Sequence, residues 1–230
     1  MTNLENLKKL AEGLGADASK CSTNLGALNV ISKALGGSGD AGTNAEAIED
    51  IAQAAPGMMI QDVVWTSSTL TLSDSTTLTA VTIPNGVTSI AGFTNQTALA
   101  SVSIPESVKI VDSGCFNGCT ALTEITAIGV ERVSGSSMNN CTRLKKVDLH
   151  SAKELNMACF ANNSALATLI LRSNEVAELD DYVFQNTPIA SGTGYVYVHK
   201  DLVNSYKADR YWSTYASQIR AIEDYPDICG

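Results

Sequence analysis

The sequence contains no apolar run long enough to cross a membrane, and it is poor in basic residues. A membrane-spanning helix needs roughly 20 consecutive apolar residues, and the longest apolar runs here are far shorter, so we expect no membrane insertion. The 15 lysine and arginine residues are outnumbered by 24 acidic residues, which gives a net charge of −9. This charge repels phosphate backbones and argues against a nucleic-acid partner. The 44% of hydrophobic residues against 17% of charged ones argues against a disordered chain.

Signatures of catalysis and of export are also missing. Neither a GxxxxGK[ST] phosphate-binding loop nor an HExxH zinc motif occurs. Histidine is present only as His150 and His199, each just after a predicted strand and without a neighbouring nucleophile, so we interpret both as turn residues rather than general bases. We therefore expect no catalytic residue and no cofactor. The N-terminus lacks the basic start, apolar stretch and cleavage site of a Sec-type leader, so we expect no classical secretion.

Residues 1–57 show helical periodicity, because apolar residues recur three and four positions apart. Thr43 and Glu46 form a capping box at the start of the third run. The stretches TNLGALNVISKALGG and TNAEAIEDIAQAAPG align at a 20-residue offset, and GGSGDAG between them is typical of a flexible joint. Short helices are marginal alone, so they must pack on each other, on the rest of the chain or on sister subunits. We predict a helical anchoring or oligomerisation module.

From Leu78 onward the period changes to about 22 residues, which is typical of a repeat architecture. Each unit opens with an apolar residue, at Leu78, Leu99, Leu122, Leu144, Leu166 and Ile189. Three positions later a short alternating strand begins, at Val81, Val102, Ile125, Val147 and Leu169. A pair with a three-residue gap follows, at Val87/Ile90, Val108/Val111, Val130/Val133, Ala152/Leu155 and Val176/Leu179. A bulky residue closes each unit, at Phe93, Phe116, Met138, Phe160 and Phe184.

One unit cannot fold alone. Six buried apolar side chains contribute about 10–15 kcal/mol, whereas ordering 22 residues costs at least about 20–40 kcal/mol in backbone entropy. Stacked units share one core, and the two ends then need caps. The prediction is an α+β protein, with a helical module over 1–57, a linker and N-terminal cap over 58–77, leucine-rich repeats forming a β-solenoid over 78–190, and a strand-helix C-terminal cap over 191–230.

The units LTAVTIPNGVTSI (78–90) and LASVSIPESVKIVDSGCFNGCTAL (99–122) resemble the BspA-type leucine-rich repeat. The resemblance extends from 78 to about 222, because VYVHKDLVNSYKADRYWSTYASQI is similar to the C-terminal end of that family. It implies a right-handed solenoid used for adhesion or recognition. Pro84 and Pro105 have no counterparts in later units, so we expect the strand ends to differ there.

Six cysteines raise the alternatives of free thiols, disulfides or a zinc site. Cys119 and Cys141 occupy one repeat position, and Cys115 and Cys159 occupy another with Ser137 between them. Neighbouring coils lie about 4.8 Å apart, beyond the Cβ separation of roughly 3.8 Å that a disulfide needs. We favour buried free thiols and predict no metal site.

Three further features have two interpretations each. The cluster Glu178, Asp180 and Asp181 is a solvated turn or a calcium site. The sequons at Asn95, Asn140 and Asn162 are glycosylation sites or, without a leader, coincidences. The C-terminal aromatic residues bind sugars or, as we favour, pack the cap: Tyr195, Tyr197, Tyr206, Tyr211, Trp212 and Tyr215.

A binding surface follows from strand alternation, because residues between the inward-facing ones must point outward. The candidate binding residues on this face are Thr82, Ser103, Glu124, Thr126, Lys146, Asp148, Thr168 and Ile170, and Ala80 and Ser101 extend the same rows. The alternative is a merely solvated sheet face.

The function we expect is non-enzymatic recognition. TNAEAIEDIAQAA (43–55) resembles N-terminal pieces of phage virion proteins. We therefore predict a homo-oligomeric virion fibre or decoration protein that contacts other virion proteins through its N-terminal module and binds a host cell-surface protein or glycan. The alternatives are a bacterial cell-surface adhesin and an enzyme with a shallow site in the cap.

Overall fold

The computed structural model describes residues 79–83 and 86–230. The predicted helical module 1–57, the predicted linker 58–77, Leu78 and Pro84 lie outside the described residues. Within the described part, no helix combines the length and apolar character needed to span a bilayer.

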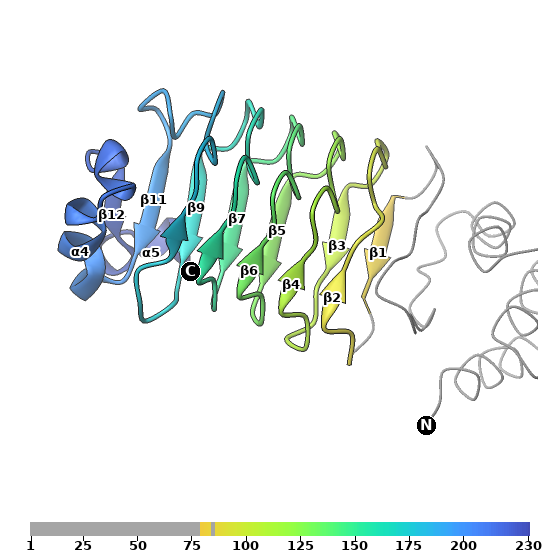
Figure 1. Ribbon diagram of the computed structural model, residues 1–230, viewed down its shortest axis with the longest axis horizontal. Coiled ribbons are helices and arrows are strands. Elements are labelled where there is room, and N and C mark those ends of the chain that lie inside the picture. The colour runs from red at the N-terminus through yellow and green to blue at the C-terminus, as the bar shows by residue number, and fades with distance from the viewer. Residues whose placement is uncertain (1–78, 84–85) are drawn as a thin grey trace, which may run out of the picture.

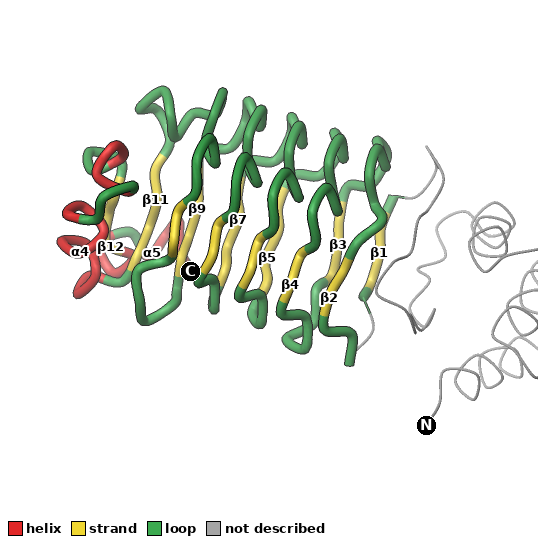
Figure 2. The backbone as a smooth tube through the Cα atoms, viewed as in Figure 1, coloured by secondary structure: helices red, strands yellow, loops and turns green. Residues whose placement is uncertain are grey.

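Stacked coils form a β-solenoid with helices at its C-terminal end (Figure 1). Five coils each contribute one longer and one shorter strand, and the next coil adds a sixth longer strand; strands of each kind pair in parallel, with turns at the strand ends (Figure 2). The longer strands are β1(Ala80–Thr82), β3(Ser101–Ser103), β5(Glu124–Ala127), β7(Lys146–Leu149), β9(Thr168–Leu171) and β11(Tyr195–Val198). The shorter strands are β2(Ser89–Ile90), β4(Ile110–Val111), β6(Arg132–Val133), β8(Glu154–Leu155) and β10(Glu178–Leu179).

The longer strands pair in the register that the repeat predicts. The long-strand sheet has the order β12(Ile219–Ala221)-β11-β9-β7-β5, and β3 joins it through the bridge between Ile104 and Ala127. Thr126 pairs with Asp148, and Asp148 pairs with Ile170. β1 and β3 have three residues where β5 has four. Pro105 explains the earlier end of β3, because proline has no N–H for the ladder.

Apolar columns run through the interior of the stack. Leu99, Leu122, Leu144 and Leu166 are fully buried in one core cluster, which confirms the predicted column. The bulky residues that close the units are also buried, and the Phe93 and Phe116 rings stack with centroids 5.3 Å apart. The second residue of each three-residue-gap pair lies in a strand of the short-strand sheet, a second sheet that the sequence patterns did not predict.

Two positions in each turn adopt left-handed backbone conformations. The first is occupied by Gly92, Gly114, Ser136, Ala158 and Tyr182, and the second by Asn95, Gly118, Asn140, Asn162 and Asn186. Glycine and asparagine tolerate this conformation best. The turn therefore accounts for the asparagines of all three sequons without any glycan.

The C-terminal segment closes the last coil. After β11 it forms η1(Lys200–Leu202), α4(Val203–Ala208), η2(Trp212–Tyr215), β12(Ile219–Ala221), η3(Ile222–Asp224) and α5(Pro226–Cys229). The Trp212 Nε1 donates to the Ala177 carbonyl at 2.6 Å, and the Ala177 N–H donates to the Tyr206 hydroxyl at 3.0 Å. Both rings are fully buried, so they pack the cap and satisfy backbone groups beside the edge strand β10.

Candidate functional site

The predicted binding residues all lie on the outer face of the long-strand sheet, the face away from the solenoid core, or on its continuation in β1 and β3. Parallel register brings them into two rows, in which Glu124 aligns with Lys146 and Thr168, and Thr126 with Asp148 and Ile170. Ser103, Glu124 and Thr126 are exposed, whereas Thr82, Lys146 and Thr168 are half-buried.

The expectation that Asp148 and Ile170 are exposed is wrong. Asp148 is 5% exposed and Ile170 is 0% exposed. Both are covered by residues 222–230, which comprise η3 and α5 and which we call the strap. Cys229 of the strap forms a small apolar cluster with Ile170 and Tyr197, separate from the main core. This contact joins residues 59 positions apart, and no repeat spacing predicts it.

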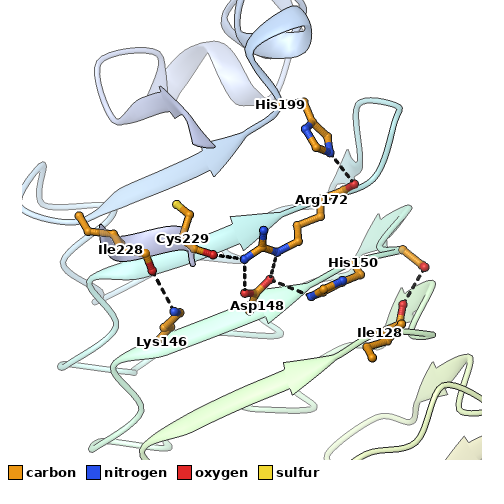
Figure 3. Close-up of polar contacts among 9 residues, drawn as sticks. Ile128, Lys146, Asp148, His150, Arg172, His199, Ile228 and Cys229 are labelled. Carbon is orange, nitrogen blue, oxygen red and sulfur yellow. Dashed lines mark hydrogen bonds and ion pairs between the residues drawn. The ribbon is translucent and has the colours of Figure 1, made fainter. Parts of the chain in front are cut away.

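A polar network fixes the strap to the sheet (Figure 3). Arg172 donates from Nε and Nη2 to the two carboxylate oxygens of Asp148, at 2.9 and 2.8 Å. The same Nη2 donates to the Cys229 carbonyl, and Lys146 Nζ donates to the Ile228 carbonyl at 2.9 Å. Hydrogen bonding to Asp148 raises the pKa of Arg172, so the guanidinium stays charged in this half-buried position.

Both histidines follow strands, as predicted, and both contact this network. His150 Nε2 lies 3.5 Å from Asp148 Oδ1, on a carboxylate already bound by Arg172. His199 Nε2 lies 2.9 Å from the Arg172 carbonyl oxygen, and its Nδ1 lies 3.4 Å from Glu223. These contacts order the edge of the sheet and the start of the strap.

The cysteines of the repeats form a buried ladder. Cys119 Sγ donates to the Phe93 carbonyl and Cys141 Sγ to the Phe116 carbonyl, both at 3.0 Å. At the same repeat position, Asn163 Nδ2 donates to the carbonyl of Met138 in the preceding coil. In these three coils the position holds a donor that links one coil to the next, whereas Thr187 at the same position donates to Phe184 within its own coil.

All four ladder thiols are free and buried, and so is Cys229, whereas Cys21 lies outside the described residues. Burial raises the pKa of Cys119 to about 12 and raises those of Cys115, Cys141 and Cys159 as well. A protonated thiol is a poor nucleophile and a poor metal ligand. These four side chains are thus suited to core packing and not to chemistry.

The acidic cluster lies beside an open groove between the last coils and the cap. Glu178, Asp180 and Asp209 line this groove of about 390 Å³, together with Asn156 and Tyr211. Asp209 comes from the cap, so the spacing of the repeats could not predict that it would join this cluster. Asp180 accepts hydrogen bonds from the N–H groups of Met157 and Asp181, and Asp209 accepts from those of Tyr211 and Trp212. Among residues 79–83 and 86–230, no group of three or more His, Cys, Asp or Glu residues has the arrangement of a metal site.

Most aromatic residues of the cap take part in packing, as predicted. Tyr197, Tyr206 and Trp212 are buried, and Tyr195 and Tyr215 are half-buried. Tyr211 is 49% exposed and lies in the wall of the groove. The Arg220 Cζ atom lies 4.0 Å from the centroid of the Tyr195 ring, and Arg220 also donates to the Tyr225 hydroxyl at 2.6 Å. These contacts link the cap to the strap.

Comparisons with known proteins support the repeat assignment. The family model for the BspA type leucine rich repeat region matches residues 91–194 in six copies, which is narrower than the range of 78 to about 222 predicted from the sequence. This is a repeat family and not a catalytic one. No curated protein matches the chain.

Several solved structures resemble this one. The pneumococcal vaccine antigen PcpA is 16% identical with a TM-score of 0.50, and the match covers 65% of this chain and 36% of PcpA. A leucine-rich repeat protein of T. pallidum is 23% identical with a TM-score of 0.45, over 56% of this chain and 60% of that protein. One from Bacteroides ovatus is 24% identical with a TM-score of 0.37, over 54% of this chain and 40% of its own length.

The chain thus spans less than two thirds of each of these proteins, and the likeness to PcpA concerns the fold alone. The architecture is consistent with a recognition or adhesion role. Residues 91–194 are similar in sequence to the BspA-type leucine-rich repeat, and they fold as the β-solenoid which that resemblance implies.

Proposed function

We propose that this chain is a non-enzymatic recognition protein that binds its partner through the uncovered part of the long-strand sheet and its continuation in β3. We call this part the open face and define it as Ser101, Ser103, Glu124, Thr126 and Ile128. The observation that carries the proposal is that all five residues are exposed on neighbouring coils, in contrast to the covered positions further along the same rows. Ile128 is an exposed apolar side chain beside polar ones, a mixture suited to a protein or glycan surface.

The setting we propose is a phage virion, where the chain acts as a fibre or decoration protein that attaches to a bacterial host. The support is the similarity of residues 43–55 to N-terminal pieces of phage virion proteins. In this arrangement residues 1–57 hold the chain, as a homo-oligomer, on other virion proteins. The open face then contacts a host cell-surface protein or glycan.

A bacterial cell-surface adhesin is the second candidate, and the match to the BspA-type repeat favours it, because that resemblance implies adhesion. Mass spectrometry of purified virions and of a bacterial surface fraction separates the two settings. Detection of the chain in virions supports the first, and detection only in the surface fraction replaces it with the second.

The binding surface itself is tested with labelled full-length protein and a panel of bacterial isolates, by flow cytometry. The double variant Ser103→Arg/Thr126→Arg places two long cations on the open face and should reduce binding by about ten-fold or more. The matched control, Thr142→Arg/Ser164→Arg, changes exposed residues of the same types in the turns. Equal loss in both variants, or no loss in the first, would refute the open face as the binding surface.

A further inference from the structure

The strap covers one half of a surface whose other half is open. Along the row Thr126, Asp148, Ile170 and Tyr197, the parallel register continues without a break. The first residue is exposed and the other three are buried beneath the strap. The strap therefore occupies the outer face in the way that a bound segment would.

The strap binds through a small set of contacts that the solenoid core does not share. Cys229 packs on Ile170 and Tyr197, and the Tyr225 ring meets the Tyr197 ring edge-on at 5.4 Å between centroids. The inward neighbours of these sheet residues, Leu169, Leu171, Val196 and Val198, belong to the main core instead. Loss of the strap contacts would thus leave the core columns in place.

At the C-terminal end of the strap, the polar contacts recognise backbone and not side chains. Lys146 and Arg172 each donate to a main-chain carbonyl of the strap, at Ile228 and Cys229. Asp148 accepts from Nε and from the same Nη2 of Arg172, which holds the guanidinium in place, so this donor is pre-organised. Carbonyls at the end of a short helical turn lack intrahelical partners, and they are present in any peptide that ends a turn here.

We propose that the strap is a displaceable intramolecular ligand, and that the surface beneath it binds a short peptide segment of a partner protein. That surface comprises Lys146, Asp148, Ile170, Arg172 and Tyr197. The segment it fits has the chemistry seen in the strap: an aromatic residue for Tyr197, a small apolar residue for Ile170, and free carbonyls for Lys146 and Arg172. This proposal rests on the proposed function, because both place binding on the outer face of the same sheet. It adds a peptide as the class of ligand and the strap as the segment that competes with it.

Opening of the strap is measured by alkylation of Cys229, which is 2% exposed. In full-length protein that carries Cys21→Ser, mass spectrometry compares the alkylation rate of Cys229 with the rates of the core thiols Cys119 and Cys141. We expect Cys229 to react faster than both, and Tyr225→Ala to accelerate it by about ten-fold. Tyr211→Ala, which removes an exposed ring outside the strap, is the matched control and should leave the rate unchanged. If Cys229 reacts no faster than the core thiols in every variant, the strap opens only on global unfolding and the proposal fails.

Peptide binding is measured by fluorescence polarisation with a labelled peptide of residues 222–230 that carries the C229A change. Full-length Y225A protein should bind it about ten-fold more tightly than the wild type, because the competing strap is weakened. Adding Arg172→Gln should remove this binding. Lys146 is half-buried and makes one contact with the strap, so Lys146→Gln should weaken peptide binding. This second variant tests the same surface if the Arg172 variant does not fold.

Arg132→Gln, on the short-strand sheet, is the control and should have no effect on peptide binding. Equal binding of the peptide to all variants would overturn the proposal. Binding of bacterial cells through the open face is unaffected by that outcome, so the two proposals fail separately.

Discussion

Arg172, the residue directly after β9, forms a two-point ion pair with Asp148 of the neighbouring strand β7, on the outer face of the solenoid. The strap buries the carboxylate, so the pair is less screened by water than the exposed ion pairs of the short-strand sheet. Asp148→Ala would leave the guanidinium half-buried without its partner. We expect the free energy of unfolding to fall by about 1–3 kcal/mol in urea denaturation.

The control for this change is Glu124→Ala on β5, which removes an exposed carboxylate at the other end of the same face. Its effect on stability should stay within about 0.5 kcal/mol. Similar effects of the two substitutions would mean that the Asp148–Arg172 pair contributes nothing beyond an exposed charge.

The buried thiols make stability fall at alkaline pH. Folding raises the pKa of Cys119 from 9.0 to about 12 and raises that of Cys141 from the same value. The folded chain therefore holds these protons where the unfolded chain has lost them. This stability is fully present below pH 9.0 and is lost as the pH rises toward the folded-state pKa.

Urea denaturation at pH 8 and pH 10 tests the thiol contribution. From pH 8 to pH 10, the free energy of unfolding should fall by about 2–3 kcal/mol more in the wild type than in the double variant Cys119→Ala/Cys141→Ala. The reason is that each thiol contributes up to about 1.4 kcal/mol per pH unit. Both proteins have the same tyrosines, so the effect of tyrosine ionisation cancels when the two are compared. An identical loss in the two proteins would contradict the role of the thiols.

At Gly129 the backbones of two neighbouring coils approach each other closely. A Cβ at this position would lie 1.8 Å from the carbonyl oxygen of Glu106, so the backbone must move to admit any side chain. We expect Gly129→Ala to lower the free energy of unfolding by about 3 kcal/mol. Gly135→Ala is the matched control, because its Cβ would meet only the Met157 carbonyl oxygen at 3.3 Å. Thermal unfolding followed by circular dichroism should give a lower melting temperature for Gly129→Ala than for Gly135→Ala. Equal melting temperatures would argue against this close approach.

Tyr182 occupies a left-handed turn position that disfavours its side chain. Its φ is 61°, and its ring is 63% exposed, so little packing offsets the strain. Tyr182→Asn should raise the free energy of unfolding by about 1 kcal/mol, because asparagine adopts this conformation more readily. Tyr211→Asn changes another exposed tyrosine at an ordinary φ of −93° and should give no gain. A loss of stability in the Tyr182 variant would show that its side chain has a packing role.

The 22-residue period was sufficient to predict the stack, the strand register and the interior columns. This follows because a solenoid core is built from contacts between equivalent positions, so one spacing predicts Leu99 above Leu122 and Phe93 beside Phe116. The same reasoning identified the repeat cysteines as a ladder. It did not predict the second sheet, because two-residue strands leave too little alternation to detect.

Which part of the outer face is exposed depended on contacts that do not recur from one repeat unit to the next. Strand alternation correctly placed Asp148 and Ile170 away from the core, and it could not reveal that Cys229 and Ile228 return across the sheet to cover them. A residue that points away from the core is free only if no distant segment packs on it. That depends on the path of the strap through space, which local patterns in a chain do not encode.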